Sequence, residues 1–196
     1  MPVRPPPFPP PHAGDMQFYT HWGLRRLHGE WRTEGAFDGL PLYAYLLAVI
    51  YKVCGYSPFV PGLIQVGLEG GTAVLLYKLG SLVFRPPATA QATGKLPLQA
   101  HLVGILAALG WAFFQPAAAY SIILMPTSWL VFIFWFVVWQ IAKRTAAPTL
   151  TRLFLLGVLI GFTAMGIATV LFLVPLLIAA LLLRWPSAIS WKLSGA

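Results

Sequence analysis

Long apolar runs separated by short polar or basic segments make up most of the chain after residue 39. The runs 60–84, 98–114 and 128–142 approach or exceed the length of about 20 residues that a helix needs to cross a bilayer. A further run, 153–183, contains no charged residue. This pattern predicts an all-α fold, specifically a polytopic membrane helix bundle.

The run 153–183 is too long for one span. A single helix of that length would measure about 46 Å, whereas the hydrocarbon core of a bilayer is about 30 Å thick. A hairpin that turns near residues 165–169 instead gives two helices of about 15 residues each, which fit the bilayer with less mismatch. We therefore expect about five spans.

A shorter apolar segment, 40–53, would form a helix of only about 21 Å. Pro41 suits a first helical turn, and Gly55 suits a helix stop. The segment and its flank are rich in side chains that favour the membrane–water interface, namely Tyr43, Tyr45, Tyr51, Lys52 and Tyr56. We expect a helix that lies in the interface and does not span.

The segment 1–39 is polar and holds four of the five acidic residues. It begins with a proline-rich stretch, 1–12, which favours polyproline II and lacks the apolar core of a signal peptide. Residues 15–31 are predicted to form a short helix with apolar and polar faces. We expect this whole segment at the water-facing surface.

Basic residues near span ends favour the cytoplasmic side, so they predict the orientation of the bundle. If the first span starts outside, the basic residues of the later loops and tail all fall inside, namely Arg85, Lys95, Lys143, Arg144, Arg152, Arg184 and Lys192. The expected organisation, in the inner or plasma membrane of the cell, is an extracytoplasmic segment 1–39, an interfacial helix 40–56, a bundle 57–185 and a cytoplasmic tail 186–196.

Composition supports the membrane assignment. Of the 196 residues, 58% are hydrophobic and 9% are charged, whereas a soluble domain is typically about a quarter charged. The net charge of +8 is not gathered into a basic stripe with interleaved aromatic residues, so we expect no nucleic-acid partner. Cys54 is the only cysteine, so it offers neither a disulfide framework nor a thiolate metal cluster.

Two charged residues fall inside the first span. An acidic residue at the depth of Glu69 indicates either a functional site or a protonated, hydrogen-bonded group. Lys78 lies nine residues further on, on a different face of the helix, so we expect it to extend towards the inner surface and not to pair with Glu69.

Several glycines and histidines have a structural interpretation beside a functional one. Gly67 with Gly71, and Gly157 with Gly161, have the spacing that is typical of close helix packing. The histidines of the first segment, His12, His21 and His28, could suggest a metal site, but solvated surface histidines are the simpler interpretation. His101, near the start of its span, is interpreted as a packing or capping residue.

Several anchors along the chain resemble those of a membrane enzyme family. They are Asp15 with Tyr19, Leu40 to Tyr45, Tyr51 with Lys52, Gly55, the span from Leu63-Ile64-Gln65 to Arg85, and Ala119-Tyr120-Ser121. Over roughly residues 14–185 the chain resembles the GT-C superfamily of membrane glycosyltransferases, specifically the protein O-mannosyltransferase-like and aminoarabinose-transferase-like group. It looks like the N-terminal half of such an enzyme or a diverged relative.

This resemblance implies transfer of a sugar from a polyprenyl-phosphate carrier to an acceptor at the outer membrane face. Asp15 would be the catalytic base or a metal-associated carboxylate; no cofactor is certain, and a divalent metal is the one candidate. Substrate-binding residues would be Tyr19, Arg25, Arg26, Tyr43 and Lys52, with the cations near the phosphate. The implied partners are a lipid-linked sugar donor and membrane lipids.

Other interpretations stay open. Asp15 also suits a helix N-cap, because it directly precedes the helical stretch. Thr127 stands where the family has a second acidic residue, and residues 166–169 lack the family's arginine. These departures favour a catalytically inactive subunit or pseudoenzyme that assembles with a partner membrane subunit. A small transporter would need paired intramembrane charges, and only Glu69 qualifies.

Overall fold

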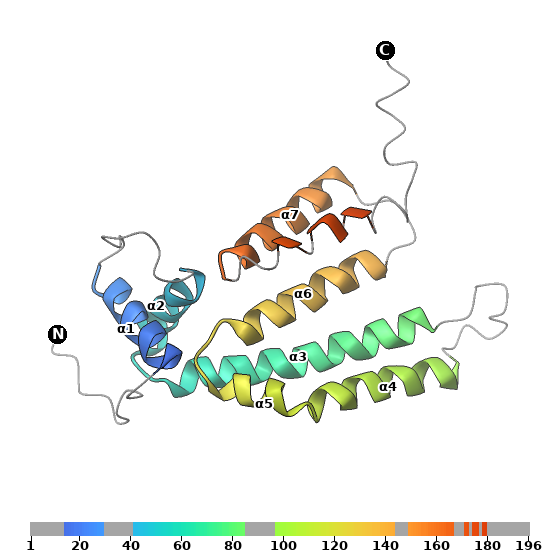
Figure 1. The fold of residues 1–196 in the computed structure, drawn as a ribbon, viewed down its shortest axis with the longest axis horizontal. Coiled ribbons are helices and arrows are strands. Elements are labelled where there is room, and N and C mark those ends of the chain that lie inside the picture. Colours follow the sequence, from blue (N-terminus) through green and yellow to red (C-terminus); the bar gives the residue numbers. More distant parts are fainter. Residues whose placement is uncertain are drawn as a thin grey trace, which may run out of the picture.

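The computed structural model describes residues 14–29, 41–84, 97–143 and 149–166, with 171–172, 174–176 and 178–179. Across these described residues the chain is helical and contains no strand, which confirms the all-α expectation. The helices of Figure 1 are α1 (Asp15–Leu27), α2 (Leu42–Cys54), α3 (Phe59–Val83), α4 (Leu98–Ala112), α5 (Gln115–Ile122), α6 (Thr127–Ala142) and α7 (Leu150–Ala164). The proline-rich stretch 1–12 and the tail 186–196 lie outside the described residues.

Glycines set the ends of the first two helices. α1 ends at Leu27, earlier than the predicted residue 31, and Gly29 follows with a φ of 95°. α2 ends at Cys54, and Gly55 has a φ of 77°, which confirms the predicted stop. Glycine adopts a positive φ without the steric penalty of a Cβ, so the chain can change direction at both places.

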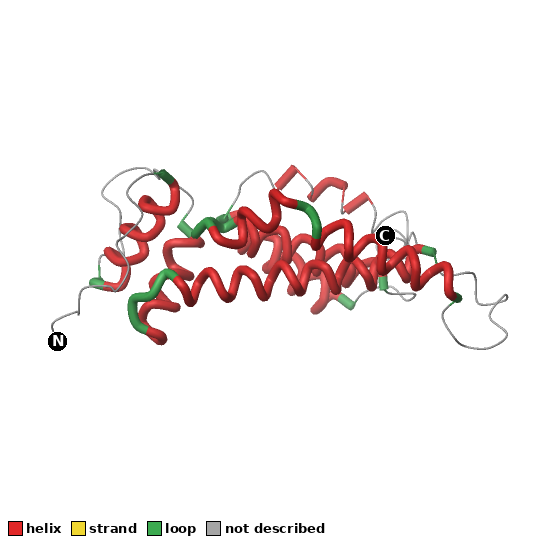
Figure 2. The backbone as a smooth tube through the Cα atoms, turned by 90° about the horizontal axis from the view of Figure 1, so that it is seen from below, coloured by secondary structure: helices red, strands yellow, loops and turns green. Residues whose placement is uncertain are grey.

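The four longest elements, α3, α4, α6 and α7, lie alongside one another and reverse direction from one to the next along the chain, so the neighbouring helices α3 and α6 run parallel (Figure 1). The C-terminal ends of α3 and α6 and the N-terminal ends of α4 and α7 lie at one end of this bundle. α1 and α2 lie together at the opposite end, as the rotated view in Figure 2 also shows. We call the α1–α2 pair the head and the other end of the bundle the far end.

α3 is the central helix and packs against both α4 and α6. It crosses α4 where Gly80 faces Gly104; a Cβ on Gly104 would lie 2.7 Å from the carbonyl oxygen of Tyr77. It meets α6 at Gly71, whose Cβ position lies 2.7 Å from the ring of Phe132. The predicted close packing is therefore confirmed at Gly71 but not at Gly67, which is exposed and has no described atom within 4 Å of its Cβ position. The tightest crossing uses Gly80 and Gly104, which the predicted spacing did not include.

The predicted packing at Gly157 and Gly161 is not found among the described residues. Both glycines are exposed, and no described atom lies within 4 Å of their Cβ positions. α7 instead makes its tight contact at its C-terminal end, where the Cβ position of Gly166 lies 2.8 Å from Leu130 of α6 and 3.2 Å from Leu42 of α2. The middle of the helix faces outward, so its small residues meet no described partner.

Between the predicted apolar runs 98–114 and 128–142 the structure has a further helix, because α5 occupies Gln115–Ile122. α4 and α5 are bent by 52° relative to each other across a short break at Phe113 and Phe114. Pro116 lies in the first turn of α5, where its missing N–H has no intrahelical partner to lose. Alanines follow it and have the highest helix propensity.

By length and composition, α3 could cross a membrane alone, and α4 with α5 forms a second candidate if the bent pair is one span. α2, α6 and α7 are apolar but shorter than a full span. α7 ends at Ala164, directly before the predicted turn at 165–169, of which residues 167–169 lie outside the described part of the chain.

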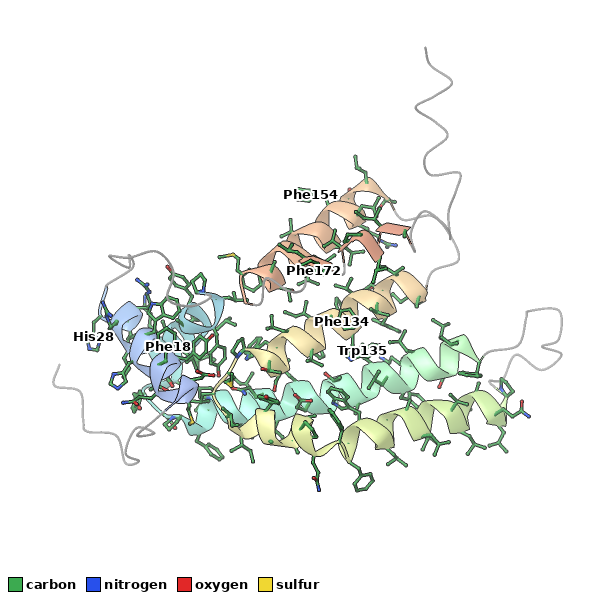
Figure 3. The ribbon with its side chains drawn as sticks, viewed as in Figure 1. Phe18, His28, Phe134, Trp135, Phe154 and Phe172 are labelled. Atoms are coloured by element: carbon green, nitrogen blue, oxygen red, sulfur yellow. The ribbon has the colours of Figure 1, made fainter. Side chains whose placement is uncertain are left out.

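Large apolar side chains cover much of the outer surface of the bundle. On α4 and the break after it, Leu98 is 72% exposed and Phe113 is 80% exposed. On α7, Leu150 is 82% exposed, and Phe154, labelled on the outer helix in Figure 3, is 68% exposed. Contiguous apolar surface of this kind indicates contact with an apolar environment or a partner.

Candidate functional site

The head is an antiparallel helix pair. Arg26, near the end of α1, lies over the ring of Tyr45 near the start of α2, and Thr20 lies beside Tyr51 near the end of α2. Gly23 lies between these contacts, with its Cβ position 3.5 Å from a carbonyl oxygen of α2, so the two backbones approach closely. The start of α1 therefore lies beside the end of α2.

Asp15 is exposed in the first turn of α1. The N-cap interpretation is wrong, because the cap is Gly14, with a φ of 86°, and no side chain caps the helix. Asp15 already has helical geometry, so its carboxylate acts on the helix only through its charge near the positive end of the dipole. The carboxylate stays at the surface, where it can meet a soluble molecule.

Tyr19 and Tyr43 connect Asp15 to the interior. Tyr19 lies one turn after Asp15, and its ring meets that of Tyr43 edge-on at 5.3 Å between centroids. Burial raises the pKa of Tyr19, and the charge of Asp15 raises it further. Burial, with Tyr51 and Tyr19 nearby, also raises the pKa of Tyr43 well above its usual range. Both phenols therefore stay protonated and can donate hydrogen bonds at neutral pH.

A buried glutamine joins the head to the bundle. The Tyr43 hydroxyl donates to Oε1 of Gln65, on α3, at 2.6 Å. The Gln65 amide nitrogen donates to the carbonyl oxygens of Tyr120 and Ile123 at 3.1 and 2.8 Å. Ser128 also faces the Tyr120 carbonyl, at 3.5 Å. Gln65 has no exposed surface, so these bonds satisfy polar groups that water cannot reach.

Sequence reasoning missed the role of Gln65, which it quoted only as part of the run that begins at Leu63. The sequence held one hint of this role. Burying an amide side chain in an apolar helix costs free energy unless other groups form hydrogen bonds with it. The partners come from α2, from the last turn of α5 and from the residue that follows α5, up to 58 residues away in the sequence.

A second pair of tyrosines lies at the end of α2, where the chain continues into α3. The rings of Tyr51 and Tyr56 lie 5.1 Å apart. Burial raises the pKa of Tyr51 to about 12, and Tyr56 adds to the shift, whereas the hydroxyl of Thr20 lowers it. Burial also raises the pKa of Tyr56. These phenols are neutral and help to form the packed base of the head.

Of the three cations that the sequence suggested for the phosphate, two lie far from Asp15 and one lies near it. Arg25 is exposed and Arg26 is buried against the rings of Trp22 and Tyr45, at 5.6 and 5.4 Å. Both lie about 15 Å from Asp15 along the axis of α1. Lys52 is exposed, directly after Tyr51, and the antiparallel pairing places it within about 6 Å of the level of Asp15 along that axis.

Glu69 has a partner on another helix. Its carboxylate accepts a hydrogen bond from the indole nitrogen of Trp111, on α4, at 3.0 Å. Lys78 instead lies over Trp139, on α6, which agrees with the expectation that the two charges do not pair. The carboxylate is therefore hydrogen-bonded between α3 and α4, on the side of α3 that faces away from α6.

The remaining candidates occupy peripheral or packing positions. His21 and His28 are exposed, as expected for surface histidines, and His12 lies outside the described residues. Among the described residues no three metal-ligating side chains gather. His101 is a packing residue whose Nδ1 lies 2.7 Å from the hydroxyl of Tyr77. Thr127 is the first residue of α6.

Comparison with known proteins identifies no relative. No family model, no curated protein and no solved structure matches the chain. The chemistry of the head and the apolar surface of the bundle therefore carry the functional interpretation.

Proposed function

We propose that this chain is an integral membrane protein with about five spans, and that its head lies at the extracytoplasmic surface. The support is the apolar outer surface of α4 and α7 together with the length of α3, about 37 Å as a helix. The orientation follows the basic residues of the far end, Lys78, Lys143 and Arg152, because the cytoplasmic side carries an excess of such residues. The head also carries basic residues, Arg25, Arg26 and Lys52, together with Asp15.

The proposed activity is transfer of a sugar from a polyprenyl-phosphate carrier to an acceptor hydroxyl, as in the GT-C enzymes that the sequence resembles. The observation that carries it is the position of Asp15. Its exposed carboxylate lies at the end of α1 that adjoins the end of α2, on the surface of the head. A lipid-linked donor would reach this surface from the bilayer.

In the proposed reaction Asp15 accepts the proton of the acceptor hydroxyl while that oxygen bonds to the anomeric carbon. The bond from the anomeric carbon to the phosphate oxygen breaks, and the polyprenyl phosphate leaves with the electron pair. Lys52 is the cation at the same end of the head, so we assign it the phosphate. Tyr19 positions Asp15, and Tyr43 anchors Tyr19 to the bundle.

The positions of the arginines in the head give them other roles than that of Lys52. Arg26 lies at the opposite end of α1, buried against two aromatic rings, so we assign it to the packing of the head. Arg25 is exposed at that end too. A divalent metal would need more donors than Asp15 offers among the described residues, so no step of the proposal passes through one.

The test measures sugar transfer from a polyprenyl-phosphate donor in membranes that contain the protein. We expect Asp15→Asn to lower turnover by about 100-fold or more, because general-base catalysis contributes roughly that much. His21→Asn, a change of an exposed residue on the same helix, is the matched control and should leave turnover unchanged. Lys52→Gln should raise KM for the donor, whereas Arg25→Gln should not. Full activity in Asp15→Asn would remove this residue from the mechanism.

A second candidate is a non-catalytic membrane subunit with the same architecture. It is favoured by the position of Thr127 at the start of α6, where the family has an acidic residue, and by the engagement of Glu69 with Trp111. Of the described residues, only Asp15 then offers a carboxylate at the head. This candidate predicts no turnover by the chain alone and stable co-purification with a complete transferase.

A further inference from the structure

Two lysines from different helices converge on one aromatic ring at the far end of the bundle. Nζ of Lys143, which follows α6, lies 3.7 Å from the centroid of the Trp139 ring. Nζ of Lys78, on α3, lies 5.0 Å from the same centroid. The two ammonium nitrogens are therefore no more than about 9 Å apart.

No carboxylate of the described residues neutralises this pair. The described acidic residues are Asp15, which lies in the head, and Glu69, which accepts its hydrogen bond from Trp111. Glu69 also lies about 13 Å from Lys78 along α3. Two like charges held at this separation repel each other, and an anion between them would relieve the repulsion.

The surroundings suit the surface of a membrane. Both lysines are exposed, and Trp139 is partly exposed between them. Tryptophan favours the level of lipid headgroups, and lysines near helix ends extend towards that level. Lys78 lies five residues before the end of α3 and is the one charged residue in the last three turns of this helix. Its charge is therefore held at the headgroup level by the ring.

We propose that Lys78, Trp139 and Lys143 form a binding site for the phosphate of an anionic phospholipid in the leaflet at the far end of the bundle. The two ammonium groups share the phosphate, and the indole ring holds both lysines in position. The site rests on the membrane assignment above but not on sugar transfer, because it lies at the opposite end of the bundle from Asp15 (Figure 1).

The experiment titrates the detergent-purified full chain with phosphatidylglycerol and counts bound lipid by native mass spectrometry. Lys78→Gln and Lys143→Gln should each weaken binding by about five-fold, since a lysine near an anionic headgroup contributes roughly that factor. Arg152→Gln is the matched control. Arg152 has the same charge, is exposed and lies at the same end, but has no contact with Trp139 among the described ones. It should change binding by less than about two-fold.

Three results would overturn the site. Equal weakening by all three variants would indicate a general surface charge. Equal binding of phosphatidylcholine, whose headgroup carries a compensating positive charge, would show that anionic lipid is not selected. Displacement of the lipid by millimolar inorganic phosphate would indicate a site for a free anion. Thermal unfolding of each variant checks its fold, and failure of sugar transfer leaves all of these outcomes unaffected.

Discussion

The hydroxyl of Tyr43 donates a 2.6 Å hydrogen bond to the side-chain carbonyl of Gln65, and neither residue has exposed surface. This bond links α2 of the head to α3 of the bundle. Through its amide nitrogen, Gln65 also holds the carbonyls of Tyr120 and Ile123 in the α5–α6 region. One side chain thus connects three parts of the fold at the base of the head.

Replacing Gln65 should therefore be more harmful than replacing Tyr43. Gln65→Leu removes three hydrogen bonds and leaves the Tyr43 hydroxyl without a partner, although the carbonyls of Tyr120 and Ile123 keep their contacts with Ser128 and the Met125 N–H. Tyr43→Phe removes one donor. A buried unsatisfied group costs about 1–3 kcal/mol, so we expect losses of roughly 3 kcal/mol or more for Gln65→Leu and about 1–2 kcal/mol for Tyr43→Phe. Thermal and denaturant unfolding in detergent measures both losses.

Tyr120→Phe is the control for this prediction. The side chain of Tyr120 is 40% exposed and only its backbone carbonyl joins the network, so the change should alter stability by less than about 0.5 kcal/mol. In a double-mutant cycle, Tyr43→Phe and Gln65→Leu should not be additive. Additive losses would mean that the two side chains do not interact.

The crossing of α3 and α4 should reject any side chain at Gly104. A Cβ there would lie 2.7 Å from the backbone oxygen of Tyr77, which cannot move without shifting the helix. We expect Gly104→Ala to destabilise the protein by about 1–3 kcal/mol. Gly110, on the same helix, has no atom within 4 Å of its Cβ position, so Gly110→Ala should be neutral or stabilising. Equal effects at both positions would refute this crossing.

The head should lose stability at high pH. Tyr51 has a folded pKa of about 12 against an ordinary value of 10.0, because it is buried. Between these values the unfolded chain releases a proton that the native chain keeps, so the free energy of unfolding falls as pH rises from about 10 to about 12. Below pH 10 both states hold the proton and the contribution is constant.

Unfolding midpoints at pH 9, 10.5 and 11.5 measure this dependence. Tyr51→Phe removes the titrating group and should flatten part of the slope above pH 10. If Tyr51 were exposed and had an ordinary pKa, Tyr51→Phe would leave the pH dependence of the unfolding midpoint unchanged. That result would contradict the burial of Tyr51.

The local sequence pattern was enough to predict the order of most helices. Alternation of apolar runs and polar breaks predicted α3, α6 and the first helix of the 153–183 hairpin within a few residues, and Gly55 fixed the end of α2. These features depend on neighbours in sequence, such as a glycine that alone tolerates a positive φ. They could therefore be predicted without knowing the fold.

Contacts between distant segments could not be predicted in this way. The periodicity of α1 does not reveal that α2 lies antiparallel to it, and this pairing is what brings Lys52 to the end of the head that holds Asp15. Arg25 and Arg26 lie about 15 Å from Asp15 along α1 itself, a distance that the predicted helix already implied. The partner of Glu69, Trp111, lies 42 residues away on α4, and no pattern within α3 indicates it. α5 was missed because a short alanine-rich segment after a break has the same composition as an apolar loop.

The most direct test of the proposed arrangement uses Cys54, the only cysteine, which is exposed at the end of α2. A membrane-impermeant maleimide is applied to intact cells and to permeabilised cells. We expect Cys54 to be labelled in intact cells. Arg152→Cys in a Cys54→Ser background, which places the thiol at the far end, should be labelled only after permeabilisation. Labelling of Cys54 only after permeabilisation would contradict the extracytoplasmic head.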